Sequence, residues 1–164
     1  MTNDARVTLR PRRTLSPIQR ALYAAQQRDP HSPVFTMARL AHIDGAVDVE
    51  RLADAFATVV ASSDTLRSRI APDEHGATAV TLDDAPATTE VLEVPRADAD
   101  RWARARAGEV IPIATRAHDS VVLRHEDGTV SWYLGLHHCV TDATAWELLF
   151  RAVERVYAGG DVTE

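Results

Sequence analysis

The stretch LGLHHCVTDATAWELLF, residues 134–150, contains the residues of this chain whose types and spacing best suit chemistry. An apolar run ends in His137 and His138, and Asp142 follows four residues after the second histidine, at the start of a helical pattern. A histidine between a strand and a helix N-terminus lies where backbone amides point outward and the helix dipole favours negative charge. We therefore consider the two histidines as acid–base groups.

Asp142 lies about one helical turn after His138, where its carboxylate can hold the loop. We expect a buried ion pair between Asp142 and Arg67, which lies in an extended piece at residues 65–70. Such a pair orients the backbone more than it adds net stability.

Spacing alone leaves other interpretations of the histidine pair open. The two residues could be hydrogen-bonded structural histidines at a strand end. With Asp142 they could also bind iron or zinc, and His118 or His125 on the preceding strand could supply further ligands. Cys139 is a candidate nucleophile, but in an extended chain its side chain points away from that of His138.

The composition is that of a globular protein. The chain has 164 residues, which suffices for one domain or one lobe of a larger one, and its 45% hydrophobic content can build a core. No apolar stretch reaches the roughly 20 residues that cross a bilayer, and the N-terminus is charged where a signal peptide is apolar. We expect a cytoplasmic protein. A single cysteine excludes internal disulfides and any zinc site made of several cysteines.

The charge distribution argues against a nucleic-acid partner. The formal net charge is −6, and acidic residues are spread along the whole chain. Basic residues cluster only near the N-terminus, at Arg6, Arg10, Arg12 and Arg13. We interpret residues 1–14 as a flexible basic arm that is solvated or meets an acidic protein, and we expect no membrane partner.

Helix and strand signals alternate along the chain. Ser16 and Pro17 predict the start of a helix that ends before residue 29, with Ile18, Leu22 and Ala25 on its apolar face. Asp48 can cap a second helix, and Asp98 or Asp100 can open a third. We expect the second helix at 49–63 and the third at 101–110. Strands are expected at 32–45, 65–70, 77–82 and 89–94.

Residues 120–136 give the clearest pattern, two strands joined by a hairpin turn at 126–129. The second strand runs into His137. Thr141 or Asp142 then caps a helix over 143–159, which stops at two glycines. Together these elements predict an α+β fold, a mixed sheet with helices mainly on one face.

Three segments resemble known motifs. The run HHCVTDA resembles the His-His-x-x-x-Asp-Gly signature of nonribosomal peptide synthetase condensation domains, members of the chloramphenicol acetyltransferase-like superfamily, with Ala143 in place of the glycine. Residues 16–23, SPIQRALY, resemble the family's first motif, Ser-x-x-Gln-x-x-Leu-Trp/Tyr. Residues 62–68, SSDTLRS, resemble its second, Arg-His-Glu-x-Leu-Arg-Thr, with Ser-Ser for Arg-His. Three motifs in family order make residues 15–160 resemble the N-terminal lobe of such a domain.

The resemblance implies an acyl-transfer site. His138, with His137 beside it, would face the reacting amine or hydroxyl, and Asp142 with Arg67 would support the loop. The backbone N–H of Ala143 would lie near the developing oxyanion. The resemblance implies no metal and no directly bound cofactor, because the acyl groups arrive on the phosphopantetheine of acyl or peptidyl carrier proteins.

Condensation domains have two similar lobes with the site between them, and this chain resembles only the first. A site with one wall is open to water, so an isolated monomer should be a poor catalyst. Our leading hypothesis is the N-terminal half of a split acyltransferase that forms an amide or ester bond, completed by a C-terminal lobe on another chain. The alternatives are a self-complementing oligomeric acyltransferase, a non-catalytic binding or docking module, and a piece of a longer synthetase.

Overall fold

The structure, a computed structural model, describes residues 13–74, 76–81 and 87–162. Most of the expected basic arm, including Arg6, Arg10 and Arg12, lies outside these residues. The end of that segment is a strand: β1 (Arg13–Thr14) pairs antiparallel with β4 (Thr78–Thr81). Arg13 and Thr14, at the end of the expected arm, are therefore paired with the folded unit.

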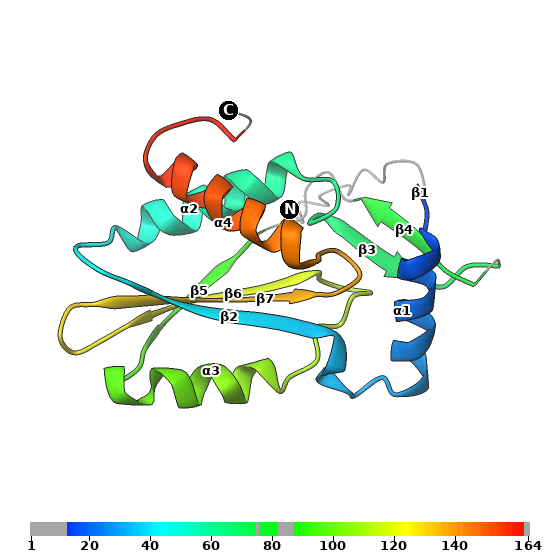
Figure 1. Cartoon of the computed structure of the whole chain (residues 1–164), viewed down its shortest axis with the longest axis horizontal. Coiled ribbons are helices and arrows are strands. Elements are labelled where there is room, and N and C mark those ends of the chain that lie inside the picture. The colour runs from blue at the N-terminus through cyan, green and yellow to red at the C-terminus, as the bar shows by residue number, and fades with distance from the viewer. Residues whose placement is uncertain (1–12, 75, 82–86, 163–164) are drawn as a thin grey trace, which may run out of the picture.

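A four-stranded mixed sheet forms the centre of the molecule, in the order β2-β7-β6-β5 (Figure 1). Strands β6 and β7 form the predicted hairpin, β2 pairs antiparallel with β7, and β5 runs parallel to β6. The bounds are β2 Thr36–Ile43, β5 Thr89–Glu93, β6 His118–Arg124 and β7 Val130–His137. The sheet therefore has both parallel and antiparallel pairs, as predicted.

The short strands β1, β4 and β3 form a second sheet, in that order. Strand β3 (Ser68–Ala71) pairs antiparallel with β4, and the Ser68 and Thr81 hydroxyls lie 3.2 Å apart across the pair. The sequence patterns at 65–70 and 77–82 indicate these strands, but carry no sign that they leave the main sheet.

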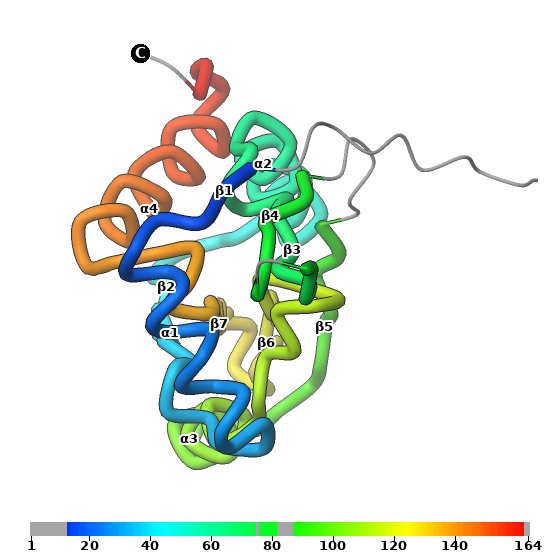
Figure 2. Tube along the Cα trace, turned by 90° about the vertical axis from the view of Figure 1, so that its right-hand side faces the viewer, coloured from blue at the N-terminus to red at the C-terminus, as the bar shows by residue number. Residues whose placement is uncertain are grey.

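Helices lie on both faces of the main sheet, with two on one face (Figures 1 and 2). Helices α2 and α4 lie side by side on that face, α3 covers the other, and α1 stands at one end. Their bounds are α1 Pro17–Arg28, α2 Val49–Ser62, α3 Ala99–Ala107 and α4 Ala143–Tyr157, with short 3-10 helices η1 Pro33–Phe35 and η2 Arg96–Asp98. The α+β prediction is confirmed, with α3 as the helix on the second face.

The largest core cluster lies between the sheet and the α2–α4 pair. Alternate residues of β7 enter it, and the residues between them face α3. Both faces of β6 and β7 are covered, which explains their nearly continuous apolar sequence. The cluster contains Leu52, Phe56 and Val60 of α2, Trp146, Leu149 and Val153 of α4, and Trp132, Leu134 and Leu136 of β7.

Helix α1 buries a face that only partly overlaps the predicted one, because Leu22 is half-buried and packs against the core, whereas Ile18 and Ala25 do not. Ile18 is 69% exposed and Ala25 is exposed, whereas Tyr23 and Gln26 are buried. The reason is the position of α1 at the end of the sheet. There it packs through Tyr23 on the loop after β7, in a cluster that includes Cys139 and Val140.

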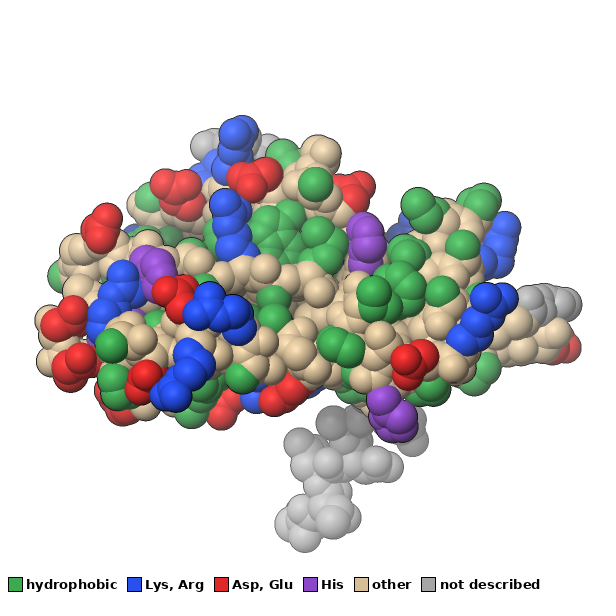
Figure 3. All heavy atoms as spheres, turned by 60° about the horizontal axis from the view of Figure 1, so that its bottom comes forward, with side chains coloured by type: hydrophobic (Ala, Val, Ile, Leu, Met, Phe, Trp, Pro, Cys, Tyr) green, Lys and Arg blue, Asp and Glu red, His purple; other side chains and the backbone are tan. Residues whose placement is uncertain are grey.

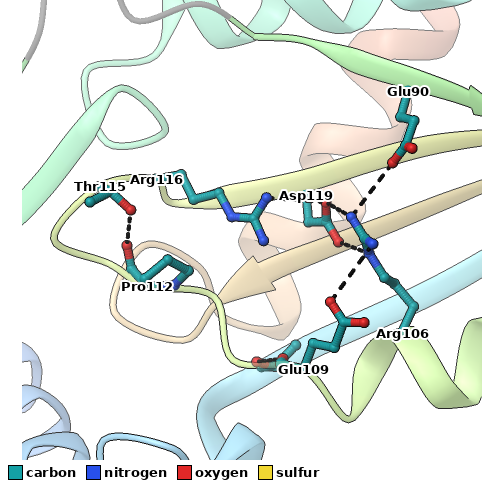
Figure 4. Close-up of polar contacts among 8 residues, drawn as sticks. Glu90, Arg106, Glu109, Pro112, Thr115, Arg116 and Asp119 are labelled. Carbon is teal, nitrogen blue, oxygen red and sulfur yellow. Dashed lines mark hydrogen bonds and ion pairs between the residues drawn. The ribbon is translucent and has the colours of Figure 1, made fainter.

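Helix α3 is joined to the sheet by an ion-pair network (Figure 4). The Arg106 guanidinium donates to both oxygens of the buried Asp119 carboxylate, at 2.7 and 3.0 Å, and also lies 3.7 Å from Glu90 and from Glu109.

The predicted cap at the start of α3 is not formed. Asp98 makes no side-chain cap bond and instead accepts from Arg101 at 2.9 Å.

Candidate functional site

The β6–β7 hairpin and the edge strand β2 determine where the histidine loop begins. Gly128 has a φ of +81°, and His125 N–H donates to Thr129 O at 3.0 Å across the predicted turn. At the other end of β7, Thr36 of β2 is opposite His137, and His138 N–H donates to Phe35 O at 2.8 Å. The loop therefore leaves the sheet from a fixed register.

His138 is half-buried, and its tautomer follows from one contact. Its Nδ1 lies 2.7 Å from the carbonyl oxygen of Thr141. A carbonyl oxygen only accepts, so Nδ1 carries the hydrogen and, in the neutral ring, Nε2 keeps its lone pair. Nε2 has no hydrogen-bond partner among the described residues. The ring can therefore accept a proton there.

His138 lines a pocket of about 310 Å³ between α1 and α4. Both helices begin at this pocket, α1 with its cap Ser16 and α4 with its cap Asp142. The positive ends of two helix dipoles next to a basic nitrogen favour negative charge that develops nearby. An adjoining hollow of similar size, lined mostly by aliphatic side chains, shares Thr65, Val140, Thr141 and Ala145 with the pocket.

His137, in contrast, is inside the protein. It is 1% exposed, its Nδ1 accepts from Cys139 N–H at 3.1 Å, and its Nε2 has no hydrogen-bond partner in the described part of the chain. Burial, together with the neighbouring His138, lowers the pKa of His137 from 6.5 to about 4. The ring is therefore neutral near pH 7, and it is separated from the pocket that His138 lines.

The structure does not contain the predicted ion pair between Asp142 and Arg67. Asp142 is exposed and its Oδ1 accepts from Ala145 N–H at 2.7 Å, so the carboxylate caps α4. Arg67 is buried and its Nη2 lies 2.6 Å from Asp64 Oδ1. Asp64 is only three residues away in the same turn, which gives Arg67 a local partner.

Ala143, the expected oxyanion donor, is the first residue of α4. Its backbone N–H belongs to the first turn of the helix, where amides lack intrahelical acceptors. Its side chain borders a neighbouring hollow with Met37, Arg39 and Trp146 instead of the His138 pocket. No non-glycine residue in the described ranges has a positive φ, so alanine fits this position without strain.

The geometry of the described residues gives little support to a nucleophilic Cys139 or to an iron or zinc site. Cys139 is 3% exposed and burial raises its pKa to about 11, so the thiolate is disfavoured. Among the described residues, no three His, Cys, Asp or Glu side chains gather as metal ligands. His118 packs edge-on against the Phe56 ring, and His125 contacts the Ser131 hydroxyl at 2.8 Å.

Gln19 is a site residue that sequence reasoning assigned no role. It lines the His138 pocket, and its Nε2 donates to the carbonyl oxygen of Cys139 at 2.9 Å. The spacing Ser-x-x-Gln at the start of α1 signals a capping box, which the structure contains. The spacing contains no sign of the second contact, because that contact joins residues 120 positions apart.

The topology and the histidine loop between β7 and α4 define one lobe of a chloramphenicol acetyltransferase-like fold. The family model of the condensation domain matches residues 12–163. The chain belongs to the condensation-domain family, and the resemblance inferred from the three motifs is confirmed.

The chain is similar to parts of much longer proteins. It is 32% identical over 162 residues to an isonitrile lipopeptide synthase of Streptomyces coeruleorubidus, covering 93% of this chain and 11% of that synthase. It is 22% identical over 151 residues to a dimodular nonribosomal peptide synthase of Bacillus subtilis, covering 88% of this chain and 6% of that protein. The solved first condensation domain of the calcium-dependent antibiotic synthetase, in complex with a substrate analogue, superposes with a TM-score of 0.82 at 25% identity.

That comparison covers 94% of this chain and 40% of the solved chain, so the chain spans less than half of the solved condensation domain. None of the helices in the described ranges is both long and apolar enough to span a membrane.

Proposed function

We propose that this chain supplies the histidine-bearing lobe of a condensation-type acyltransferase, which forms an amide or ester bond from carrier-protein-bound thioesters in nonribosomal peptide or related natural-product biosynthesis. The observation that carries the proposal is the His138 ring. Its Nδ1–H is held by Thr141 O, its Nε2 is left with a lone pair, and it lines a pocket at two helix N-termini.

In this reaction His138 acts as the base. The acceptor amine or hydroxyl attacks the thioester carbonyl carbon and passes its proton to His138 Nε2. The carbon–sulfur bond then breaks, and the leaving thiolate of the carrier's phosphopantetheine takes that proton. Negative charge on the carbonyl oxygen is favoured near the first turn of α4, where Ala143 N–H is a candidate donor. His137 supports the loop from inside the fold, and Asp142 supports it by capping α4.

A complete site requires the second lobe. The partner lobe would supply the missing wall, exclude water and bind the carrier proteins. The chain itself requires no directly bound cofactor in this scheme, because phosphopantetheine belongs to the carriers. The split arrangement, with the second lobe on another chain, is a prediction that complementation can test.

The test is product formation with the second lobe of a condensation domain supplied in trans, an acyl-loaded carrier protein and an amine acceptor. We expect His138→Ala to lower the rate roughly 10²- to 10⁴-fold, the usual contribution of a positioned acid–base group. His31→Ala, at an exposed residue beyond α1, is the matched control and should retain the rate. Unchanged product formation by His138→Ala would refute the base assignment. Carrier binding without product, unaffected by loss of both histidines, would instead indicate a docking module.

A further inference from the structure

We propose that Gln19 is a positioning residue for His138, holding the loop so that the histidine keeps a single tautomer. This inference rests on the proposed role of His138 as the base. Gln19 acts through the backbone of the loop, since its own contacts are to Ser16 and Cys139.

Both the oxygen and the nitrogen of the Gln19 side-chain amide are hydrogen-bonded. Oε1 accepts from Ser16 N–H at 3.0 Å, and Gln19 N–H donates to the Ser16 hydroxyl at 3.2 Å, which completes the capping box. Nε2 donates to Cys139 O at 2.9 Å. The orientation of the amide is determined by its partners, because a backbone N–H only donates and a carbonyl only accepts. The capping box thus orients the amide so that Nε2 donates to the loop.

Helix α1 packs against the loop through Tyr23 and Leu22 but makes few hydrogen bonds to it. Among the described residues, the other hydrogen bond between them is that of the Cys139 thiol, 4.0 Å from Gln19 O. Within the loop, Val140 N–H donates to His137 O at 2.9 Å and Cys139 N–H donates to the His137 ring at 3.1 Å. The Gln19 bond therefore fixes the peptide between Cys139 and Val140 from outside the loop.

Along the chain, the Cys139–Val140 peptide lies between His138 and Thr141, whose carbonyl oxygen selects the tautomer of the His138 ring. Thr141 O, two residues after Cys139, accepts from His138 Nδ1 at 2.7 Å. If the Cys139–Val140 peptide turns, Thr141 O moves relative to the ring. Nδ1 then loses its acceptor, and the hydrogen can move to Nε2, the atom that must be unprotonated to act as a base.

Two substitutions separate the two functions of the Gln19 amide. Gln19→Glu keeps an acceptor for Ser16 N–H and replaces the donor to Cys139 O with a second oxygen. Gln19→Lys keeps a donor and loses the acceptor. Long-range ¹⁵N NMR of the histidine rings reports the tautomer on the chain alone. We expect Nδ1–H at His138 in the wild type and Gln19→Lys, and a mixture of tautomers in Gln19→Glu.

Gln26→Glu is the matched control on the same helix. Gln26 is buried, and its Nε2 donates to Asp29 O and Ser32 O, away from the loop. This variant should lower stability and leave the His138 signals unchanged, which separates positioning from general destabilisation. With the second lobe present, Gln19→Glu should lower kcat roughly 10- to 100-fold with little change in KM.

A single Nδ1–H tautomer in folded Gln19→Glu would overturn the proposal. If Gln19→Glu does not fold, a mixed tautomer in folded Gln19→Lys would overturn it equally. Failure of the proposed acyltransferase function gives a different result: the wild-type chain forms no product with any second lobe, and the tautomer still follows the Gln19 donor.

Discussion

Two adjacent histidines have opposite environments in this lobe. His138 is half-buried at a pocket and is hydrogen-bonded through Nδ1, whereas His137 is enclosed and accepts a backbone N–H. The alternation of side chains at the end of a strand sends neighbours in opposite directions. One residue of the pair is therefore available to a substrate, and the other fixes the loop.

The buried histidines predict acid sensitivity of the fold. Burial lowers the pKa of His137 and of His118 from 6.5 to about 4, and Arg116 contributes to the shift of His118. Between these values the unfolded chain binds more protons than the folded one, so the free energy of unfolding falls as pH decreases from 6.5 to 4. At pH 5 the loss should be about 2 kcal/mol for each histidine. Urea unfolding at a series of pH values measures it.

His118→Leu removes one of these groups at a site that packs against Phe56. It should reduce the pH dependence between pH 6.5 and 4.5 by about half, while exposed His31→Ala leaves it unchanged. An identical pH dependence in His118→Leu would show that this histidine is not held neutral by the fold.

The N-terminus of α4 is stabilised by a helix cap. Because Asp142 caps Ala145 N–H and Arg67 pairs with Asp64, a double-mutant cycle should give a coupling near zero for Arg67 with Asp142. The coupling of Arg67 with Asp64 should be about 0.5–1 kcal/mol, since Asp64 is partly exposed. Asp142→Ala alone should cost about 1 kcal/mol, and Asp142→Asn, which preserves a capping oxygen, much less. A coupling of several kcal/mol between Arg67 and Asp142 would contradict this arrangement.

At α3, the Arg106–Asp119 pair should contribute more than an ordinary surface pair. Both oxygens of the buried carboxylate bind one guanidinium, and the removal of Arg106 leaves Asp119 with Arg116 at 3.6 Å (Figure 4). We expect Arg106→Ala to lower the free energy of unfolding by about 2–3 kcal/mol. Arg101→Ala, which breaks an exposed pair with Asp98, is the control and should change it by less than about 0.5 kcal/mol. Equal effects of the two substitutions would refute a special role for the buried pair.

Local signals predicted most of the elements, and long-range contacts account for the differences. The capping residues Ser16 and Asp48 and the turn at Gly128 determine local backbone geometry, and each lies where it was predicted. The prediction of the apolar face of α1 was only partly right, because periodicity identifies an apolar stripe but not the surface that the helix meets. The contact of Gln19 with Cys139 depends on how distant segments approach each other, which residue spacing does not encode. Arg67, in contrast, pairs with Asp64, three residues away in the same turn.

At the scale of the whole molecule, the His138 pocket lies on a surface of mixed character. Ile18, 69% exposed, lines the pocket, and Leu148, 61% exposed, borders the adjoining hollow. On the face shown in Figure 3, hydrophobic side chains gather between groups of acidic and basic ones. In the proposed function, the second lobe would cover these two exposed aliphatic side chains.

We therefore expect this chain to be a monomer by light scattering after size exclusion over a concentration series, with a larger mass only after addition of a complementary lobe. The described surface has four large hydrophobic side chains that are strongly exposed, Ile18, Val34, Val91 and Leu148, fewer than the apolar core of an obligate oligomer interface requires. Binding of the lobe should also raise the melting temperature, because a ligand of the folded state stabilises it. A stable trimer would contradict the expectation and would favour a site completed by symmetry, so that small acyl thioesters should then react on the chain alone.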